Sequence, residues 1–330
     1  MKKSVRLLST VLLSSLAGWA NASPTIEVGT RVWVSEGETE WSHCASSACG
    51  GGSGTIRISG TSYTYTMGDP TSKLNYSGTK ANTLELYADI RSEQFVTSLK
   101  LGTGSGDSGT FRDQDWLTIV GVYDNLEFSD TVSDIKNSDV NYWVADFGYE
   151  LDSDLLSNAV DITPFVGYFN YTEKLSAYGL TPVSDGSLVN IASSVSYATE
   201  VIRNEAEWSG FRLGVDLKKS FTEKLSGSLN VAYVIADVTN KDSHLLRTSS
   251  SDLGAAPNII SSGDGDGVML DIILDYDYSD ALTFDFGYRM WNFEADNAVT
   301  KFGPSFSTSF PSRSLFSKRD GFMLGASYRF

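Results

Sequence analysis

Two short stretches of the chain carry residue types that can perform acid–base chemistry. The stretch "TFRDQDW", residues 110–116, places Asp113 and Asp115 one residue apart. The stretch "KDSH" places Asp242 and His244 one residue apart, and His244 is one of only two histidines. Because residues i and i+2 of an extended strand point to the same face, each pair presents both side chains together.

The two pairs have complementary chemistry. Asp242 beside His244 would hold the imidazole in one tautomer and stabilise its charged form, while the neutral imidazole takes a proton from water. Two close carboxylates share a proton, and the protonated one can donate a hydrogen bond to a reacting carbonyl. Taken separately, each motif is also typical of a solvated turn or a structural strand end. The catalytic interpretation therefore requires that the two pairs face each other.

The elements that would position these pairs are alternating strands. The last segment, "RDGFMLGASYRF", places large apolar residues at every second position and ends on Phe330. About ten segments alternate in this way, beginning near residues 27, 82, 95, 140, 162, 205, 225, 268, 282 and 319. This pattern predicts an all-β transmembrane antiparallel up-and-down β-barrel with a closed, narrow lumen. The alternative is a strand arrangement in a soluble sandwich.

Strand parity predicts where the Asp–His pair points. In the segment from residue 225, Leu229, Val231 and Tyr233 form the bulky apolar face, which we expect to contact lipid. The other face, continued outward, carries Asp242 and His244 into the barrel mouth. We expect Asp113 and Asp115 on the outer end of a strand that returns from the second long loop.

The chain ends and connections indicate its location. Residues 1–22 have a basic start, an apolar run and a small-residue cleavage pattern, which predict a removed signal peptide rather than an uncleaved anchor. We expect residues 23–330 to form a single bacterial outer-membrane domain, with short periplasmic turns. Long extracellular loops are expected near residues 36–80, 105–138, 176–200, 240–264 and 297–318.

The net charge indicates which binding partners to expect, and the cysteine content indicates whether a disulfide or a metal site is expected. The formal net charge of −16 argues against nucleic acid and favours cationic peptides or divalent ions. Cys44 and Cys49, the only cysteines, predict a small disulfide in an exported protein. A metal site would need more ligands than the adjacent His43, so we expect no metal, and we interpret His43 as a surface loop residue.

The two motifs resemble those of the omptin family, outer-membrane aspartyl-type proteases built on ten-stranded barrels. The family's D-Q-D-W matches residues 113–116, and its D-x-H matches Asp242-Ser243-His244. The resemblance implies an endopeptidase that cleaves peptides or proteins at the Gram-negative cell surface with an activated water and no covalent intermediate. It implies a monomer that needs no cofactor apart from outer-membrane lipopolysaccharide.

The sequence departs from omptins at two substrate-binding positions. Omptins that cleave after basic residues carry one Glu and one Asp in an acidic pocket; in this chain the first position falls near Trp41, with Glu38 and Glu40 close by, and the second is Asn240. A basic cleavage preference is therefore not implied. The alternative function is a non-enzymatic barrel on the same scaffold, either an adhesin or a structural or ligand-binding protein. A passive channel is disfavoured because about ten strands leave little lumen.

Overall fold

The computed structural model describes residues 24–151, 160–183 and 192–330, and the predicted signal peptide lies outside them. The described chain is all-β apart from a short 3-10 helix, η2 (Ser47–Cys49). None of the described helices is long and apolar enough to cross a membrane. The strands are β1 (Thr25–His43), β2 (Ser53–Ile58), β3 (Thr61–Ser92), β4 (Phe95–Gly106), β5 (Thr110–Ile119), β6 (Tyr123–Tyr149), β7 (Asp161–Pro182), β8 (Val195–Ser220), β9 (Leu225–His244), β10 (Ile259–Asp277), β11 (Leu282–Phe302) and β12 (Thr308–Arg329).

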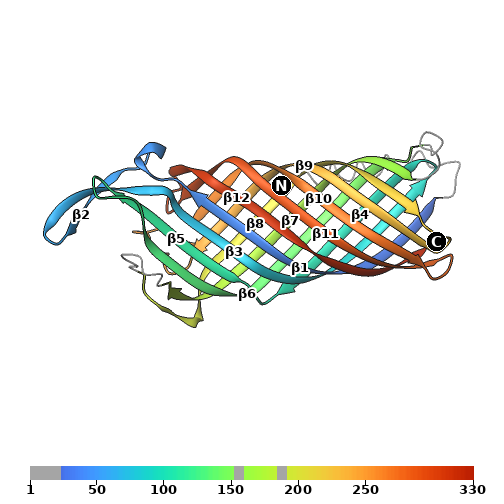
Figure 1. Cartoon of the computed structure of the whole chain (residues 1–330), viewed down its shortest axis with the longest axis horizontal. Helices are drawn as coiled ribbons and strands as arrows, with labels where there is room; N and C mark the ends of the chain where they lie inside the picture. The colour runs from blue at the N-terminus through green and yellow to red at the C-terminus, as the bar shows by residue number, and fades with distance from the viewer. Residues whose placement is uncertain (1–23, 152–159, 184–191) are drawn as a thin grey trace.

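The strands form one antiparallel sheet that closes on itself, which confirms the predicted barrel (Figure 1). Closure occurs at β1, which pairs with β12 on one side and with β3 on the other. The twelve segments occupy about ten positions around the ring. β5 continues β4 in the same position between β3 and β6, while β2 pairs only with the outer part of β3.

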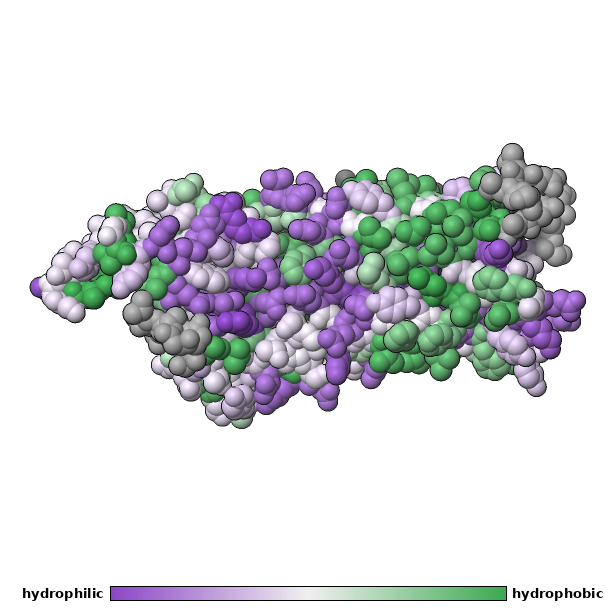
Figure 2. All heavy atoms as spheres, viewed as in Figure 1, coloured by the Kyte–Doolittle hydropathy of each residue, from purple (hydrophilic) through white to green (hydrophobic). Residues whose placement is uncertain are grey.

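The outer surface of the barrel has two regions, one apolar and one polar. Toward the end that holds the C-terminus, exposed apolar side chains such as Val34, Leu86, Ile235 and Leu324 form a band, as a lipid-facing surface requires (Figure 2). Beyond this band, toward β2 and β5, the exterior is mainly polar (Figure 2). The membrane-spanning segments are therefore the parts of the strands at the end of the barrel that holds the C-terminus (Figures 1 and 2).

The lumen next to the band is filled with side chains. Arg289 is fully buried and hydrogen-bonds to Glu85 and Asp271, with closest distances of 2.7 Å and 2.8 Å. Aromatic rings pack around this ion cluster, and Arg319 pairs with Glu173 further along the lumen. The rings are Trp33, Tyr142, Phe169, Tyr171, Trp208, Trp291 and Phe293.

The predicted long loops are shorter than expected because the strands extend well beyond the apolar band. Most of the segments near 36–80 and 105–138 are paired strand, including all of β5. Their glycine, serine and threonine content is typical of loops, yet the backbone pairs in register with its neighbours. At the polar end of the barrel, the longest described connection follows β9, between His244 and Ile259.

Candidate active site

β9 carries the Asp–His pair to the polar end of the barrel, with both side chains on the inner face as parity predicts. Asp242 is fully buried, and the side chain of His244 is 11% exposed. Their neighbours across the strands are Asn204 and Ile202 of β8. On the exterior at this height lie Asp237 and residues 239 and 241, all polar, so the pair lies beyond the apolar band.

The Asp242 carboxylate is held by several donors. Its Oδ2 accepts hydrogen bonds from the Tyr76 hydroxyl at 2.6 Å, Trp41 Nε1 at 3.2 Å and Asn204 Nδ2 at 3.3 Å. Its Oδ1 lies 3.4 Å from Nε2 of His244. Because one oxygen is fixed by three donors, the other is held facing the imidazole, as an orienting carboxylate requires.

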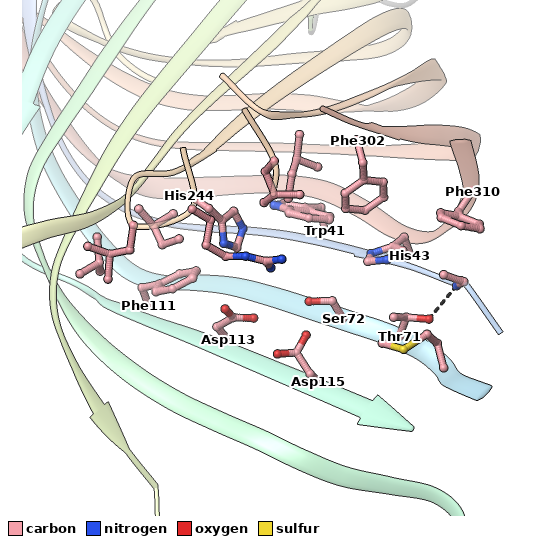
Figure 3. Close-up of a pocket in the computed structure, with 18 of the residues that line it drawn as sticks. Trp41, His43, Thr71, Ser72, Phe111, Asp113, Asp115, His244, Phe302 and Phe310 are labelled. Carbon is pink, nitrogen blue, oxygen red and sulfur yellow. Dashed lines mark hydrogen bonds between the residues drawn. The ribbon is translucent and has the colours of Figure 1, made fainter. Parts of the chain in front are cut away.

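β5 carries the acid pair. Asp113 pairs with Leu74 of β3, and Asp115 pairs with Ser72, so both aspartates face the same side. Figure 3 shows the two carboxylates below His244 and Trp41, across one shared cavity. The expectation of a strand returning from a loop was wrong. β5 is the outgoing continuation of β4, and its pairing with β3 continues past the gap between the two segments.

Burial perturbs the protonation of both pairs. Burial, the neighbouring Asp115 and then Asp242 raise the pKa of Asp113 well above its ordinary value. Burial also raises the pKa of Asp115. Burial lowers the pKa of His244, against the opposing effect of Asp242. These shifts favour an acid pair that retains a proton and an imidazole that is neutral, which is the protonation state needed for water activation.

Arg247 is a charged residue of the cavity that the sequence motifs did not indicate. It follows His244 by three residues and lines the same cavity. Its guanidinium binds Asp252 through two hydrogen bonds of 2.7 Å and 3.0 Å. The positive charge lowers the pKa of Asp113, of Asp115 and of His244.

His43 does not lie in a surface loop, so the interpretation from the sequence was wrong. It is the last residue of β1, it is only 5% exposed, and it lines the cavity. Its Nδ1 is buried and has no hydrogen-bond partner among the described residues. Burial, followed by the nearby His244, lowers the pKa of His43 to about 4, so this imidazole is neutral at neutral pH. The sequence held one signal for this direction. His43 lies two residues after Trp41 in the same strand, so the two side chains face the same side.

The two predicted substrate-binding positions differ in their surroundings. Trp41 lines the cavity and donates to Asp242. Asn240 is buried deeper on β9, where its Oδ1 accepts a hydrogen bond from Asn204, and it is not among the residues that line the cavity. Of these two positions, Trp41 lines the cavity and Asn240 does not.

Cys44 and Cys49 form a disulfide, and Ala45, next to Cys44, lines the cavity. The loop that the disulfide closes is attached to two other strands. Cys44 N donates to the carbonyl of Pro311, and Ala45 N donates to Thr71 Oγ1 at 2.6 Å (Figure 3). Since Ala45 and Thr71 both line the cavity, the hydrogen bond between them holds the disulfide loop as part of the cavity lining.

The fold and this site define a class of protein, a closed β-barrel of the bacterial outer membrane with a buried polar constellation in one mouth. Residues 55–312 match the Protochlamydia outer membrane protein family, Pom, and the chain belongs to that family. The resemblance to omptins is therefore one of fold and local motifs, and family membership lies with Pom. No curated protein matches the chain.

The chain also matches solved structures, and one of those it matches shares its fold. The outer membrane protease OmpT from Escherichia coli is 12% identical, with a TM-score of 0.63 over 93% of this chain and 96% of that one. OprG from Pseudomonas aeruginosa is 13% identical, with a TM-score of 0.30 over 94% and 96%. The toluene transporter TbuX from Ralstonia pickettii is 11% identical, with a TM-score of 0.27 over 95% and 91%. At these identities the likeness to OmpT concerns the fold alone.

Proposed function

We propose that this protein is an omptin-like outer-membrane endopeptidase with its active side on the extracellular face. The observation that carries the proposal is that Asp113, Asp115 and His244 line one cavity at the polar end of the barrel, with Asp242 directly behind the histidine. The cavity has a volume of about 420 Å³, enough for a side chain and a short stretch of peptide backbone.

The chemistry follows from the protonation of the groups. Neutral His244 accepts a proton from a water molecule as the water oxygen adds to the peptide carbonyl carbon. Asp242 stabilises the resulting imidazolium. The proton retained by the acid pair is donated in a hydrogen bond to the carbonyl oxygen as negative charge develops there. The C–N bond then breaks, and the proton on His244 passes to the leaving nitrogen.

The surroundings of the proposed enzyme follow from the same scaffold. We expect a monomer in outer-membrane lipid, and lipopolysaccharide is the partner that the omptin resemblance implies. The substrates would be peptides or proteins that reach the cell surface. A cofactor is not needed, since water and the four side chains provide every proton transfer.

The test is cleavage of a randomised quenched-fluorescent peptide library by the barrel folded in lipopolysaccharide-containing micelles. We expect His244→Gln and Asp113→Asn each to reduce kcat/KM by at least about 100-fold, because each removes a group that acts in the transition state. Asp134→Asn is the matched control, since Asp134 is an exposed aspartate of β6 that does not line the cavity.

Two results would contradict the proposal. One is the absence of cleavage by folded wild-type protein across pH and peptide composition, which would favour the non-enzymatic barrel. The other is cleavage that His244→Gln and Asp113→Asn leave unchanged, which would assign the activity to a contaminant or to another site. Far-UV circular dichroism and the heat-dependent shift in gel mobility would establish folding of each variant.

A further inference from the structure

One side of the cavity is a wall of four aromatic rings, here called the ring wall. It consists of Trp41 and His43 of β1, Phe302 of β11 and Phe310 of β12. The ring centroids of Trp41 and His43 are 6.0 Å apart, those of His43 and Phe302 are 4.8 Å apart, and those of Phe302 and Phe310 are 6.0 Å apart. Figure 3 shows the ring wall on the side of the cavity away from Asp113 and Asp115.

The ring wall is continued by aliphatic side chains. Leu253 and Ile259, from the connection after β9 and the start of β10, line the same cavity. Among the described residues, the charged groups that line the cavity are Asp113, Asp115 and Arg247, with the titratable His244 beside them. The acidic groups are therefore confined to the acid pair, where Arg247 opposes their charge.

This distribution decides which side chains the cavity accommodates. A lysine or arginine side chain against the ring wall would lose water and gain cation–π contacts but no carboxylate partner on that wall, and the cation–π contacts offset only part of the cost of desolvation. A large apolar side chain would remove its own surface and that of the rings from water. Aromatic side chains would gain further from edge and stacking contacts with the four rings.

His43 is part of the ring wall but does not give it a charge at neutral pH. It is clamped between Trp41 and the two phenylalanines, so its ring is held at a fixed angle. Its buried Nδ1 is a single unpartnered polar atom within the described part of the wall. Because the ring is uncharged at neutral pH, the wall offers no electrostatic attraction to an acidic side chain.

We propose that the part of the cavity lined by the ring wall is the specificity pocket. It binds a large apolar or aromatic substrate side chain adjacent to the scissile bond. This inference rests on the proposed endopeptidase function and supplies its substrate class. Trp41 then has two roles, because it lines the pocket and also donates to Asp242. Substitution at Trp41 would disturb both, so the test uses Phe302 and Phe310.

The experiment compares peptides that share one background and differ at a single guest position, occupied by Phe, Leu, Ala, Lys or Glu. Cleavage positions are mapped by mass spectrometry. We expect kcat/KM for the Phe and Leu peptides to exceed that for the Lys and Glu peptides by at least about 100-fold. The Ala peptide should fall between these extremes, since it neither fills the pocket nor buries a charge.

The variants assign this preference to the ring wall. Phe302→Ala should lower the ratio of kcat/KM for the Phe peptide to kcat/KM for the Ala peptide by about 10-fold or more. Phe310→Glu should increase cleavage of the Lys peptide relative to the Phe peptide, because it adds a carboxylate to the wall. Phe316→Ala is the matched control, since Phe316 of β12 contacts Lys318 and does not line the cavity.

The outcomes separate the two proposals. His244-dependent cleavage that prefers Lys would overturn the pocket assignment and leave the endopeptidase function intact. An equal loss for all peptides in folded Phe302→Ala would also overturn it, since that result indicates a structural role. Absence of cleavage of every peptide by the wild type would instead reject the proposed function, and the pocket assignment with it.

Discussion

At the residue scale, the candidate site depends on charges that shift one another's protonation. Burial lowers the pKa of His244 and so favours its neutral form, while burial of the two carboxylates raises the pKa of the acid pair and so favours retention of a proton. Arg247 acts on both sets, since its positive charge lowers the pKa of the acid pair and of His244. The dependence of kcat/KM on pH would therefore be bell-shaped. Deprotonation of His244 sets the acid limb, and loss of the proton of the acid pair sets the alkaline limb.

Arg247→Gln should move both limbs of this profile to higher pH, by about one pH unit. Without the cation the pKa of His244 rises, so a higher pH is needed to make the imidazole neutral. The pKa of the acid pair also rises, so the shared proton is retained to a higher pH. The measurement is kcat/KM across pH for the best peptide of the guest series.

Arg203→Gln provides the control for this experiment. Arg203 also binds a carboxylate, Glu200, through two hydrogen bonds, but it is exposed and does not line the cavity. Its profile should match that of the wild type. A shift of the two limbs in opposite directions, or no shift with Arg247→Gln, would show that Arg247 does not set these pKa values.

At the element scale, the acid pair depends on the continuity of β4 and β5. The chain leaves β4 at Gly106 and enters β5 at Thr110, and both segments stay between β3 and β6. Gly109, within this junction, has a φ of 147°, a conformation that favours glycine. At Gly106 a Cβ atom would lie 1.7 Å from the carbonyl oxygen of Lys80, so β3 approaches too closely for a side chain.

Gly106→Ala should therefore displace the start of β5 and reduce kcat/KM by about 100-fold, because a small displacement of a catalytic group is costly. Gly52→Ala is the control, since a Cβ atom at Gly52 would meet nothing within 4 Å. Both variants should give the heat-dependent gel shift of a folded barrel. Wild-type activity in folded Gly106→Ala would show that the junction does not position the acid pair.

At the scale of the whole molecule, the barrel is closed both around its circumference and along its lumen. Its sheet has no free edge around the ring, because β1 pairs with both β3 and β12. Its lumen is blocked by the Arg289 cluster and the aromatic rings around it. Replacing the partners of Arg289 would leave a buried charge unpaired, which is strongly destabilising, so this cluster is a fixed part of the barrel.

This closure predicts that the protein forms no passive channel. Wild-type barrel in planar lipid bilayers should give no stable conductance steps at moderate voltage, because the filled lumen leaves no continuous water path. A variant with Trp291→Ala and Phe293→Ala, which removes two of the lumen rings, is the comparison for which leakage is expected. Reproducible steps from the wild type would contradict the closed lumen and favour transport.

The sequence by itself determined the fold class, the faces of the strands and the two motifs. Alternation is a local property, because each side chain's face follows from its position along its own strand. The inward direction of Asp242 and His244 could therefore be predicted from Leu229, Val231 and Tyr233. The extended ends of β3 and β6 could not, because glycine- and serine-rich segments form strands only when a partner strand is present.

Only the tertiary structure decided which residues meet. The cavity is lined by residues of β1, β3, β5, β7, β8, β9, β10, β11 and β12, and closure of the ring brings these strands around one mouth. His43 and Arg247 enter the site in this way, and Asn240 is left in the layer below. Contacts of this kind depend on the packing of several strands at once, so the pattern within one strand can give the direction of a side chain, as it does for His43, but not the residues that it meets.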